Sequence, residues 1–221
     1  MQASAVLLSG GLDSAVLAAA EIHAGRDVWP IHVRAGLAWE DAESAAILAL
    51  LASPPFKGCA HPIARLSVDM RDVYPSSHWA VEGRAPEYDE PDETVYLEGR
   101  NITLIAKAAV LCAKLHVARL VLGPLAGNPF PDATPEFFTT MARAMSLGLA
   151  HTLAIETPFR ALHKSDVVRL GARLNVPLEL TLSCMQPVGG QHCGVCNKCR
   201  ERKEAFDEAG VDDPTMYVGR R

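Results

Sequence analysis

Short apolar runs alternate with longer segments of helical periodicity along most of this 221-residue chain, and this alternation restricts the fold most strongly. The apolar runs are short and largely continuous, which is typical of strands buried on both faces. They lie at residues 3–8, 27–33, 64–68, 118–124 and 152–158. The segments of helical period lie at residues 12–20, 40–52, 101–115, 136–150 and 164–177. Strands alternating with such helices form βαβ units, so the sequence predicts an α/β fold with a parallel sheet and helices on both faces.

The composition is that of an ordinary soluble globular protein, with 49% hydrophobic and 21% charged residues. The net charge of −5 argues against a broad nucleic-acid or membrane-binding surface, because both normally require a basic face. No apolar run approaches the ~18 residues of a membrane span, and the N-terminus lacks the basic region of a signal peptide. We therefore expect a cytoplasmic protein that acts on small molecules.

Two parts of the chain depart from the alternation. Residues 69–99 have no clear period and become rich in proline, glycine and acidic residues, which indicates a functional or mobile loop. Residues 183–221 hold four cysteines and a charged helical segment. No change of composition requires a second independent domain. We therefore predict a body at residues 1–182 and a cysteine-bearing segment at residues 183–221, packed together as one unit.

The string SGGLDS follows the first predicted strand and opens the first predicted helix. Gly10 and Gly11 let the backbone approach a ligand, and the free N–H groups of such a turn point at one anion. Ser9 and Ser14 can donate to phosphate oxygens. Asp13 would repel a bare phosphate, so it either binds a bridging Mg²⁺ or accepts from backbone N–H groups of the turn. The string matches neither a Walker A loop nor a dinucleotide fingerprint, and the plain structural alternative is an ordinary strand-to-helix turn.

Four cysteines, Cys184, Cys193, Cys196 and Cys199, follow the spacing C-x8-C-x2-C-x2-C. Two overlapping C-x-x-C pairs with a fourth thiol suit a tetrahedral, all-thiolate zinc site. Such a closed site has no open coordination position, so its expected role is structural. An iron–sulfur cluster and a redox thiol pair are the alternatives. Because four thiols fill the shell, His192 is expected at the surface or behind the ligands.

The string SGGLDS closely resembles the PP-loop of the N-type ATP pyrophosphatases. The resemblance implies a Rossmann-like fold of the adenine nucleotide alpha hydrolase type, which binds ATP and cleaves it between the α- and β-phosphates. Pyrophosphate would lie in the turn while AMP is transferred to an oxygen of the acceptor. Adenylation converts a poor leaving oxygen into a good one, which a nitrogen or sulfur nucleophile then displaces.

Three further strings resemble the 7-cyano-7-deazaguanine synthase family of queuosine biosynthesis, so the likeness covers most of the chain. They are ETVYLEGRNITLI (93–105), TPFRALHKSDVVRLG (157–171) and LSCMQPVGGQHCGVCNKCRERKEAF (182–206). The resemblance implies a carbon–nitrogen ligase that adenylates the carboxylate of 7-carboxy-7-deazaguanine and lets ammonia attack it. A second activation of the resulting amide would give the nitrile. No covalent enzyme nucleophile is required, so catalysis would rest on positioning and charge stabilisation.

The resemblance also implies roles for individual residues. Asp13 and Lys164 would be catalytic, and Mg²⁺ would accompany ATP. Asp132 would bind the deazaguanine ring, and the four cysteines of the tail would bind zinc. Lys164 could instead be a solvated surface lysine, and Asn101 merely a helix N-cap. The ATP-binding residues would be Leu8, Ser9, Gly10, Gly11, Leu12, Asp13, Ser14, Arg100 and Asn101. The family tends to be dimeric, so a homodimer is implied as well.

The loop LAGNPFPDATPEF (125–137) is shorter than its counterpart in the family, and several of the family's polar residues are missing from it. Since this loop is expected to face the acceptor, a PP-loop ligase that amidates or adenylates a different carboxylate is the first alternative. A tRNA-thiolating enzyme is the second, but Cys59 and Cys112 are poor sulfur carriers: one lies in a loop and the other on an apolar helical stripe. A non-catalytic, zinc-stabilised binding module is the third.

Overall fold

The computed structural model describes residues 2–219, whose core is a parallel sheet. Within this range the sheet has five strands in the order β3-β2-β1-β4-β5. The strands are β1 (Ala3–Leu7), β2 (Asp27–Arg34), β3 (Ala64–Ser67), β4 (Arg119–Val121) and β5 (Ala154–Glu156). All neighbouring pairs run parallel. The α/β fold and the position of every predicted strand are therefore confirmed.

The helices follow the predicted segments closely. They are α1 (Leu12–His23), α2 (Glu40–Leu51), α3 (Trp79–Glu82), α4 (Arg100–Leu115), α5 (Pro135–Leu149), α6 (Lys164–Arg173) and α7 (Asn197–Ala209). Three short 3₁₀ turns lie at η1 (Asp92–Val95), η2 (Pro131–Ala133) and η3 (Leu178–Leu180). Within residues 2–219, no helix has the length and apolar character needed to cross a membrane.

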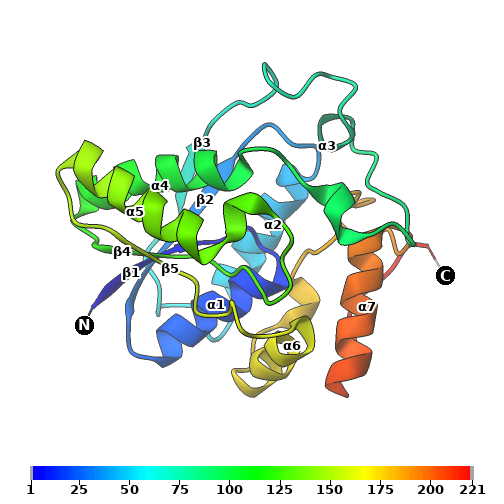
Figure 1. Ribbon diagram of the computed structural model, residues 1–221. Coiled ribbons are helices and arrows are strands. Elements are labelled where there is room, and N and C mark those ends of the chain that lie inside the picture. Colours follow the sequence, from blue (N-terminus) through cyan, green and yellow to red (C-terminus); the bar gives the residue numbers. More distant parts are fainter. Residues whose placement is uncertain (1, 220–221) are drawn as a thin grey trace.

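Helices cover both faces of the sheet. One face packs against α1, α2, α6 and α7 around a cluster that includes Val16, Ile47, Val168 and Phe206. The other packs against α4 and α5 around Ile105 and similar residues. Figure 1 shows α4 and α5 on one side of the strands and α1 with α6 on the other. The inner strands β1, β2 and β4 are therefore largely buried, whereas residues of the edge strands β3 and β5 alternate between exposed and half-buried.

The carboxyl ends of β1 and β4 form the edge where a ligand is expected. The chain continues from β1 to β2 on one side, whereas β4 pairs with β1 on the other. Connections that diverge in this way leave a crevice outside the strand ends, which is the usual ligand position in open α/β sheets. Gly123, after β4, lies beside the first turn of α1 here, and a Cβ on it would be in ordinary van der Waals contact with the carbonyl oxygen of Asp13, at 3.6 Å.

The long loop between β3 and α4 covers part of this edge and contains buried side chains of its own. It includes α3 and η1, and Tyr74 and Leu97 pack with Trp39 in a small apolar cluster. The Tyr74 hydroxyl donates to the carbonyl oxygen of Glu98 at 2.6 Å. Ala38 N–H donates to the carbonyl oxygen of Ala80 at 2.9 Å. These contacts hold the β3–α4 loop, whose sequence shows no periodicity, against the carboxyl edge of the sheet.

The C-terminal segment packs directly on the body. Leu182 N–H donates to the carbonyl oxygen of Gly10 at 2.8 Å, which ties the start of the segment to the SGGLDS turn. The fully buried Arg202 of α7 donates to Thr181 Oγ1 and to the carbonyl oxygen of Leu178, both at 2.8 Å. These bonds fix α7 beside the sheet's carboxyl edge.

Candidate functional site

The SGGLDS turn is held in shape by its own serines. Ser9 N–H donates to Ser14 Oγ at 3.2 Å, Ser14 Oγ donates to the Gly11 carbonyl oxygen at 3.0 Å, and Gly11 N–H donates to Ser9 Oγ at 3.2 Å. Gly10 has φ +78°, and a Cβ there would approach the Glu43 carbonyl oxygen to 3.0 Å. Only glycine fits that conformation and that contact without strain. The shape of the turn is therefore set by contacts within the chain itself.

Asp13, in the first turn of α1, pairs with Lys164, the first residue of α6. Lys164 Nζ donates to Asp13 Oδ2 at 2.8 Å, although the two residues are 151 positions apart. The other oxygen, Oδ1, is buried and has no hydrogen-bond partner among the described residues. Burial alone would lower the pKa of Lys164, but the carboxylates of Asp13 and Glu201 hold it above its ordinary value. A buried, unpartnered carboxylate oxygen in a polar cleft suits a divalent cation.

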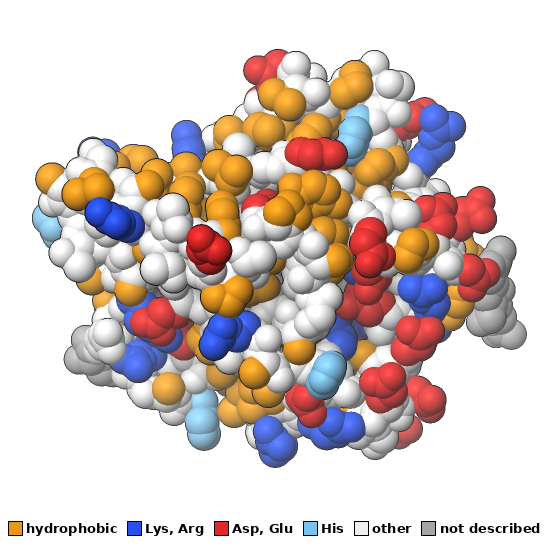
Figure 2. All heavy atoms as spheres, in the orientation of Figure 1, with side chains coloured by type: hydrophobic (Ala, Val, Ile, Leu, Met, Phe, Trp, Pro, Cys, Tyr) orange, Lys and Arg blue, Asp and Glu red, His pale blue; other side chains and the backbone are white. Residues whose placement is uncertain are grey.

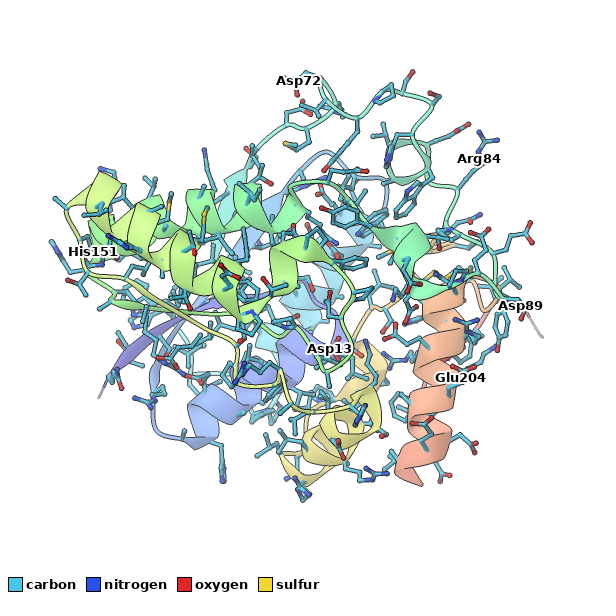
Figure 3. All side chains as sticks on the ribbon, in the orientation of Figure 1. Asp13, Asp72, Arg84, Asp89, His151 and Glu204 are labelled. Carbon is cyan, nitrogen blue, oxygen red and sulfur yellow. The ribbon has the colours of Figure 1, made fainter. Side chains whose placement is uncertain are left out.

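Two adjoining cavities open from the turn. The first, of about 300 Å³, reaches the C-terminal segment and is lined by Lys164, Lys198 and Glu201 as well as the turn. The second, of about 280 Å³, runs beneath α4 and is lined by Asn101 and Asp132 as well as the turn. Both share the walls formed by Ser9, Gly11, Asp13, Arg100 and Gly123. They form one cleft with the turn at its centre, and Figure 3 shows Asp13 near the middle of the molecule, at the start of α1.

Arg100 projects into this cleft from the first turn of α4. Its guanidinium lies 6.0 Å from the centre of the Trp39 ring, and its buried Nε has no hydrogen-bond partner within residues 2–219. An unpaired donor of this kind on a cavity wall is available to an anionic ligand.

Asn101 and Asp132 bind each other beside Arg100. Asn101 N–H donates to Asp132 Oδ2 at 2.9 Å, and its side-chain amide donates to the Asp132 carbonyl oxygen at 2.9 Å. The N-cap position of α4 is Gly99, with φ +73°, so the alternative that Asn101 is the N-cap is wrong. Burial raises the pKa of Asp132 against the opposing effect of these hydrogen bonds and of Arg100.

The four cysteines of the tail come together as the spacing predicts. All four are buried, and their sulfur atoms lie within 4.8 Å of one another. Cys184 and Cys196 Sγ are 3.9 Å apart, and Cys193 and Cys199 Sγ are 3.8 Å apart. A tetrahedron of Zn–S bonds of about 2.3 Å has edges of about 3.8 Å. The cluster therefore has the dimensions of a four-thiolate metal site.

Backbone N–H groups surround this cluster. Those of Gln186 and Cys193 point at Cys184 Sγ at 3.3 Å, and that of Gly194 points at Cys199 Sγ at 3.4 Å. Such donors stabilise thiolates.

His192 is buried rather than at the surface, and its Nε2 accepts from Ser183 N–H at 3.0 Å. It therefore lies behind the cysteines and supports the chain that carries them.

Comparison with known proteins agrees with this geometry. Residues 3–210 match the model of the family described as queuosine biosynthesis protein QueC. The chain belongs to this family. A 7-cyano-7-deazaguanine synthase from Methanoculleus marisnigri is 33% identical over 98% of this chain and 99% of its own length. One from Oceanobacillus iheyensis is 32% identical over 96% of this chain and 97% of its own length.

Solved structures support the fold of this QueC-family chain at lower identity. A 4-thiouridine synthetase, crystallised with RNA and bound ATP, aligns with a TM-score of 0.53 and 14% identity over 95% of this chain and 50% of its own. The U34-tRNA thiolase NcsA from Methanococcus maripaludis, with its [4Fe-4S] cluster, aligns at 0.50 and 13% identity over 94% of this chain and 65% of its own. At such identities the likeness concerns the fold alone.

The structure places most of the residues singled out from the sequence on one cleft. The turn, Lys164 and Arg100 meet at its centre, whereas Asn101 and Asp132 line only the second cavity. The cysteine cluster borders the first cavity through Cys184. Cys59 is exposed, Cys112 lies in the core, and neither lines these cavities. Among residues 2–219, the one cysteine that lines the cleft is Cys184, a member of the four-cysteine cluster.

Sequence reasoning missed Glu43, which lines the first cavity from α2. Burial raises its pKa to about 7, Arg100 counteracts this rise, and Glu40 adds to it. In the sequence it is one of three acids at a helix start, where the helix dipole already explains them. Nothing in the sequence distinguishes Glu43 from the other two acids, although only Glu43 lines the cavity beside the turn.

Sequence reasoning also gave neither Lys198 nor Glu201 of α7 a place in this cleft. Burial by itself raises the pKa of Glu201, but Lys164 and Lys198 outweigh it and lower that pKa to about 2. The one available signal was a lysine in the first turn of a helix, where the dipole disfavours a cation.

Proposed function

We propose that this QueC-family protein is an ATP-dependent carbon–nitrogen ligase that converts 7-carboxy-7-deazaguanine and ammonia into 7-cyano-7-deazaguanine. The observation that carries the proposal is the Asp13–Lys164 pair beside the SGGLDS turn, with one Asp13 oxygen left unpartnered in the cleft. The family and the full-length relatives named 7-cyano-7-deazaguanine synthase support the choice of acceptor.

The reaction proceeds in two adenylations. A carboxylate oxygen of the acceptor attacks the α-phosphate of ATP, pyrophosphate leaves, and ammonia then displaces AMP to give the amide and a proton. The amide oxygen attacks a second ATP in the same way. Loss of AMP and a proton from that adduct leaves the nitrile. Each cycle therefore consumes two molecules of ATP and one of ammonia.

The turn and Lys164 hold the phosphates in this proposal. The first N–H groups of α1, which have no partner within the helix, face the pyrophosphate, and the helix N-terminus favours its charge. Lys164 neutralises charge that develops as the α–β bond breaks. Mg²⁺ would be held by Asp13, which lines the cleft and whose Oδ1 has no hydrogen-bond partner within residues 2–219, and would supply charge neutralisation on the phosphates. Arg100 provides a further cation, and Asn101 shapes the adjoining wall.

The acceptor would occupy the second cavity. Asp132 lies on its wall, and stacked rings of Tyr96 and Phe130 stand 5.1 Å apart beside it. The Asp132 carboxylate already accepts a hydrogen bond from Asn101 N–H, but each of its oxygens has a second lone pair that can accept from a ring N–H. The short loop between β4 and α5 therefore retains one acidic group for a purine-like ring.

The cysteine cluster would hold a structural Zn²⁺. All four positions of the tetrahedron are protein thiolates, so the ion has no open position for substrate. The proposed division into residues 1–182 and 183–221 describes two parts of one unit, because Ala205 and Phe206 share a core with the body. A cytoplasmic homodimer that acts on small molecules completes the proposal.

Incubation with 7-carboxy-7-deazaguanine, ammonium, ATP and Mg²⁺, followed by mass spectrometry, tests this function. Formation of the nitrile together with AMP and pyrophosphate is the expected result. AMP formation without amide or nitrile would assign the protein to a different carboxylate acceptor, the alternative that the short loop at residues 125–137 suggests. No AMP formation with any acceptor would overturn the ligase assignment.

A further inference from the structure

A continuous row of alternating charges runs along the first cavity from the SGGLDS turn to α7. Lys164 Nζ lies 2.8 Å from Asp13 Oδ2 and 3.3 Å from Glu201 Oε1. Lys198 Nζ lies 2.9 Å from Glu201 Oε2 and 3.2 Å from Asp92 Oδ1. All five residues line the cavity. Glu201 is thus the bridge that holds two lysines on the same cavity wall.

Each of these lysines keeps a donor for a ligand. An ammonium group has three N–H bonds, and each lysine uses two of them on carboxylates. The Lys164 and Lys198 side chains line the first cavity and are only 18% and 16% exposed, so the remaining N–H bond of each is available to a ligand in that cavity. Two fixed ammonium groups joined by one carboxylate suit a ligand with several anionic oxygens.

Helix stability explains Lys198 only through its i,i+3 ion pair with Glu201. Lys198 lies in the first turn of α7, where the helix dipole disfavours a cation. It also lies between Cys196 and Cys199, so the cysteine cluster sets where its backbone lies. Acidic side chains gather on this side of the molecule, over α7 and the loop before α4 (Figure 2). A polyanion entering here would be repelled unless lysines on the cavity wall offset those charges.

We infer that Lys198 is a second phosphate-binding lysine and that Glu201 is a positioning residue that holds Lys198 and Lys164 together on the pyrophosphate end of ATP. This inference rests on the proposed ATP-dependent function. It gives the cysteine-bearing tail a part in the reaction: the metal site fixes the start of α7, and α7 delivers Lys198 to the cleft.

The test is calorimetric titration of the full chain, with its metal, using three probes in the presence of Mg²⁺: pyrophosphate, α,β-methylene-ATP and AMP. Lys198→Gln should weaken binding of the first two by about tenfold, the effect of losing one charge-assisted hydrogen bond. AMP binding should not change, because AMP lacks the β- and γ-phosphates. Lys198→Arg should restore much of the loss. The control is Lys114→Gln, which removes an exposed lysine of α4.

Glu201→Gln tests the positioning role, with Glu204→Gln as the matched control on the same helix, since Glu204 is 61% exposed. Glu201→Gln should raise the KM for ATP while leaving the KM for the acceptor unchanged. In the double variant with Lys198→Gln, the rise in the KM for ATP should be smaller than the two single effects predict together, because both substitutions disturb the same contact between Lys198 and the phosphates. Metal content and circular dichroism of each variant should match the wild type.

The inference falls if folded, metal-containing Lys198→Gln binds pyrophosphate as the wild type does, since the lysine is then only part of a surface bridge. It also falls if only the KM for the acceptor changes, which would place Lys198 on the acceptor carboxylate. If the wild type itself binds neither pyrophosphate nor the ATP analogue, the proposed function fails together with it. If the wild type binds pyrophosphate and Lys198→Gln binds it equally well, this inference is overturned but the proposed function is not.

Discussion

Asp132 holds the first turn of α4 through Asn101. The carboxylate of Asp132 accepts the backbone N–H of Asn101 at 2.9 Å, and the Asn101 side-chain amide donates to the Asp132 carbonyl oxygen at 2.9 Å. Asp132 is 6% exposed, so these bonds form away from water. The pair joins the loop after β4 to the helix that carries Arg100 into the cleft.

A double-mutant cycle separates this structural role from substrate binding. Asn101→Ala and Asp132→Ala should each lower the free energy of unfolding by about 1–2 kcal/mol. Their combination should show a coupling of about 1 kcal/mol in urea unfolding. If Asp132 also binds the acceptor, Asp132→Asn should raise the KM for the acceptor, whereas Asn101→Ala should leave that KM nearly unchanged. Additive losses of stability would contradict the pairing.

Asp13 is expected to be needed for turnover but not for the metal site. Asp13→Ala removes both the partner of Lys164 and the free oxygen proposed to bind Mg²⁺, so AMP release should fall by at least about a hundredfold. Zinc content should stay at the wild-type level. Asp72→Asn is the matched control, because Asp72 is exposed and lies far from Asp13 on the β3–α4 loop (Figure 3). Full turnover by Asp13→Ala would show that the PP-loop assignment is wrong.

Removal of one thiol should release the metal and loosen the tail. Cys196→Ser takes one corner from the cluster whose sulfur atoms lie within 4.8 Å of one another. Metal analysis should fall from about one zinc per chain to a small fraction of that, and the thermal midpoint should fall as well. Cys59→Ser, at an exposed free cysteine, serves as the control and should retain both properties. A variant without metal but with unchanged stability would contradict the structural role.

Glu43 should make stability depend on pH. Burial raises its pKa from 4.5 to about 7, so the folded protein keeps this proton while the unfolded chain releases it. The free energy of unfolding therefore decreases as pH rises from 4.5 to about 7, by roughly 3 kcal/mol for this group. Glu43→Gln removes that loss.

Urea unfolding of the wild type and Glu43→Gln at pH 5 and pH 8 measures this effect. The stability of the variant relative to the wild type should increase by roughly 2.5 kcal/mol between the two values. Glu179→Gln, at an exposed glutamate, should show no such change and corrects for the general effect of pH. An equal difference at both pH values would mean that Glu43 is ionised in the folded protein at pH 5.

Most of the architecture could be predicted from local patterns. Apolar runs indicate the strands and helical periods indicate the long helices, because the inner strands of a sheet with helices on both faces bury most of their side chains. The spacing of Cys184, Cys193, Cys196 and Cys199 likewise predicts a compact cluster, since two short C-x-x-C pairs bring thiols together by chain geometry alone. The loop at residues 69–99 shows no period, and its docking depends on contacts with distant residues such as Trp39.

The sequence by itself therefore determined the fold class, the glycine-containing turn at Ser9–Ser14 and the clustering of the four cysteines, because each depends on residues close together in the chain. Only the tertiary structure decided what surrounds the turn: the pairing of Asp13 with Lys164, the bridge from Glu201 to two lysines, and the burial of Glu43. These relationships join residues far apart in the sequence. A charged side chain on a helix shows no local sign of which distant cavity it will face, so only the packing of α6 and α7 at the sheet's carboxyl edge reveals it.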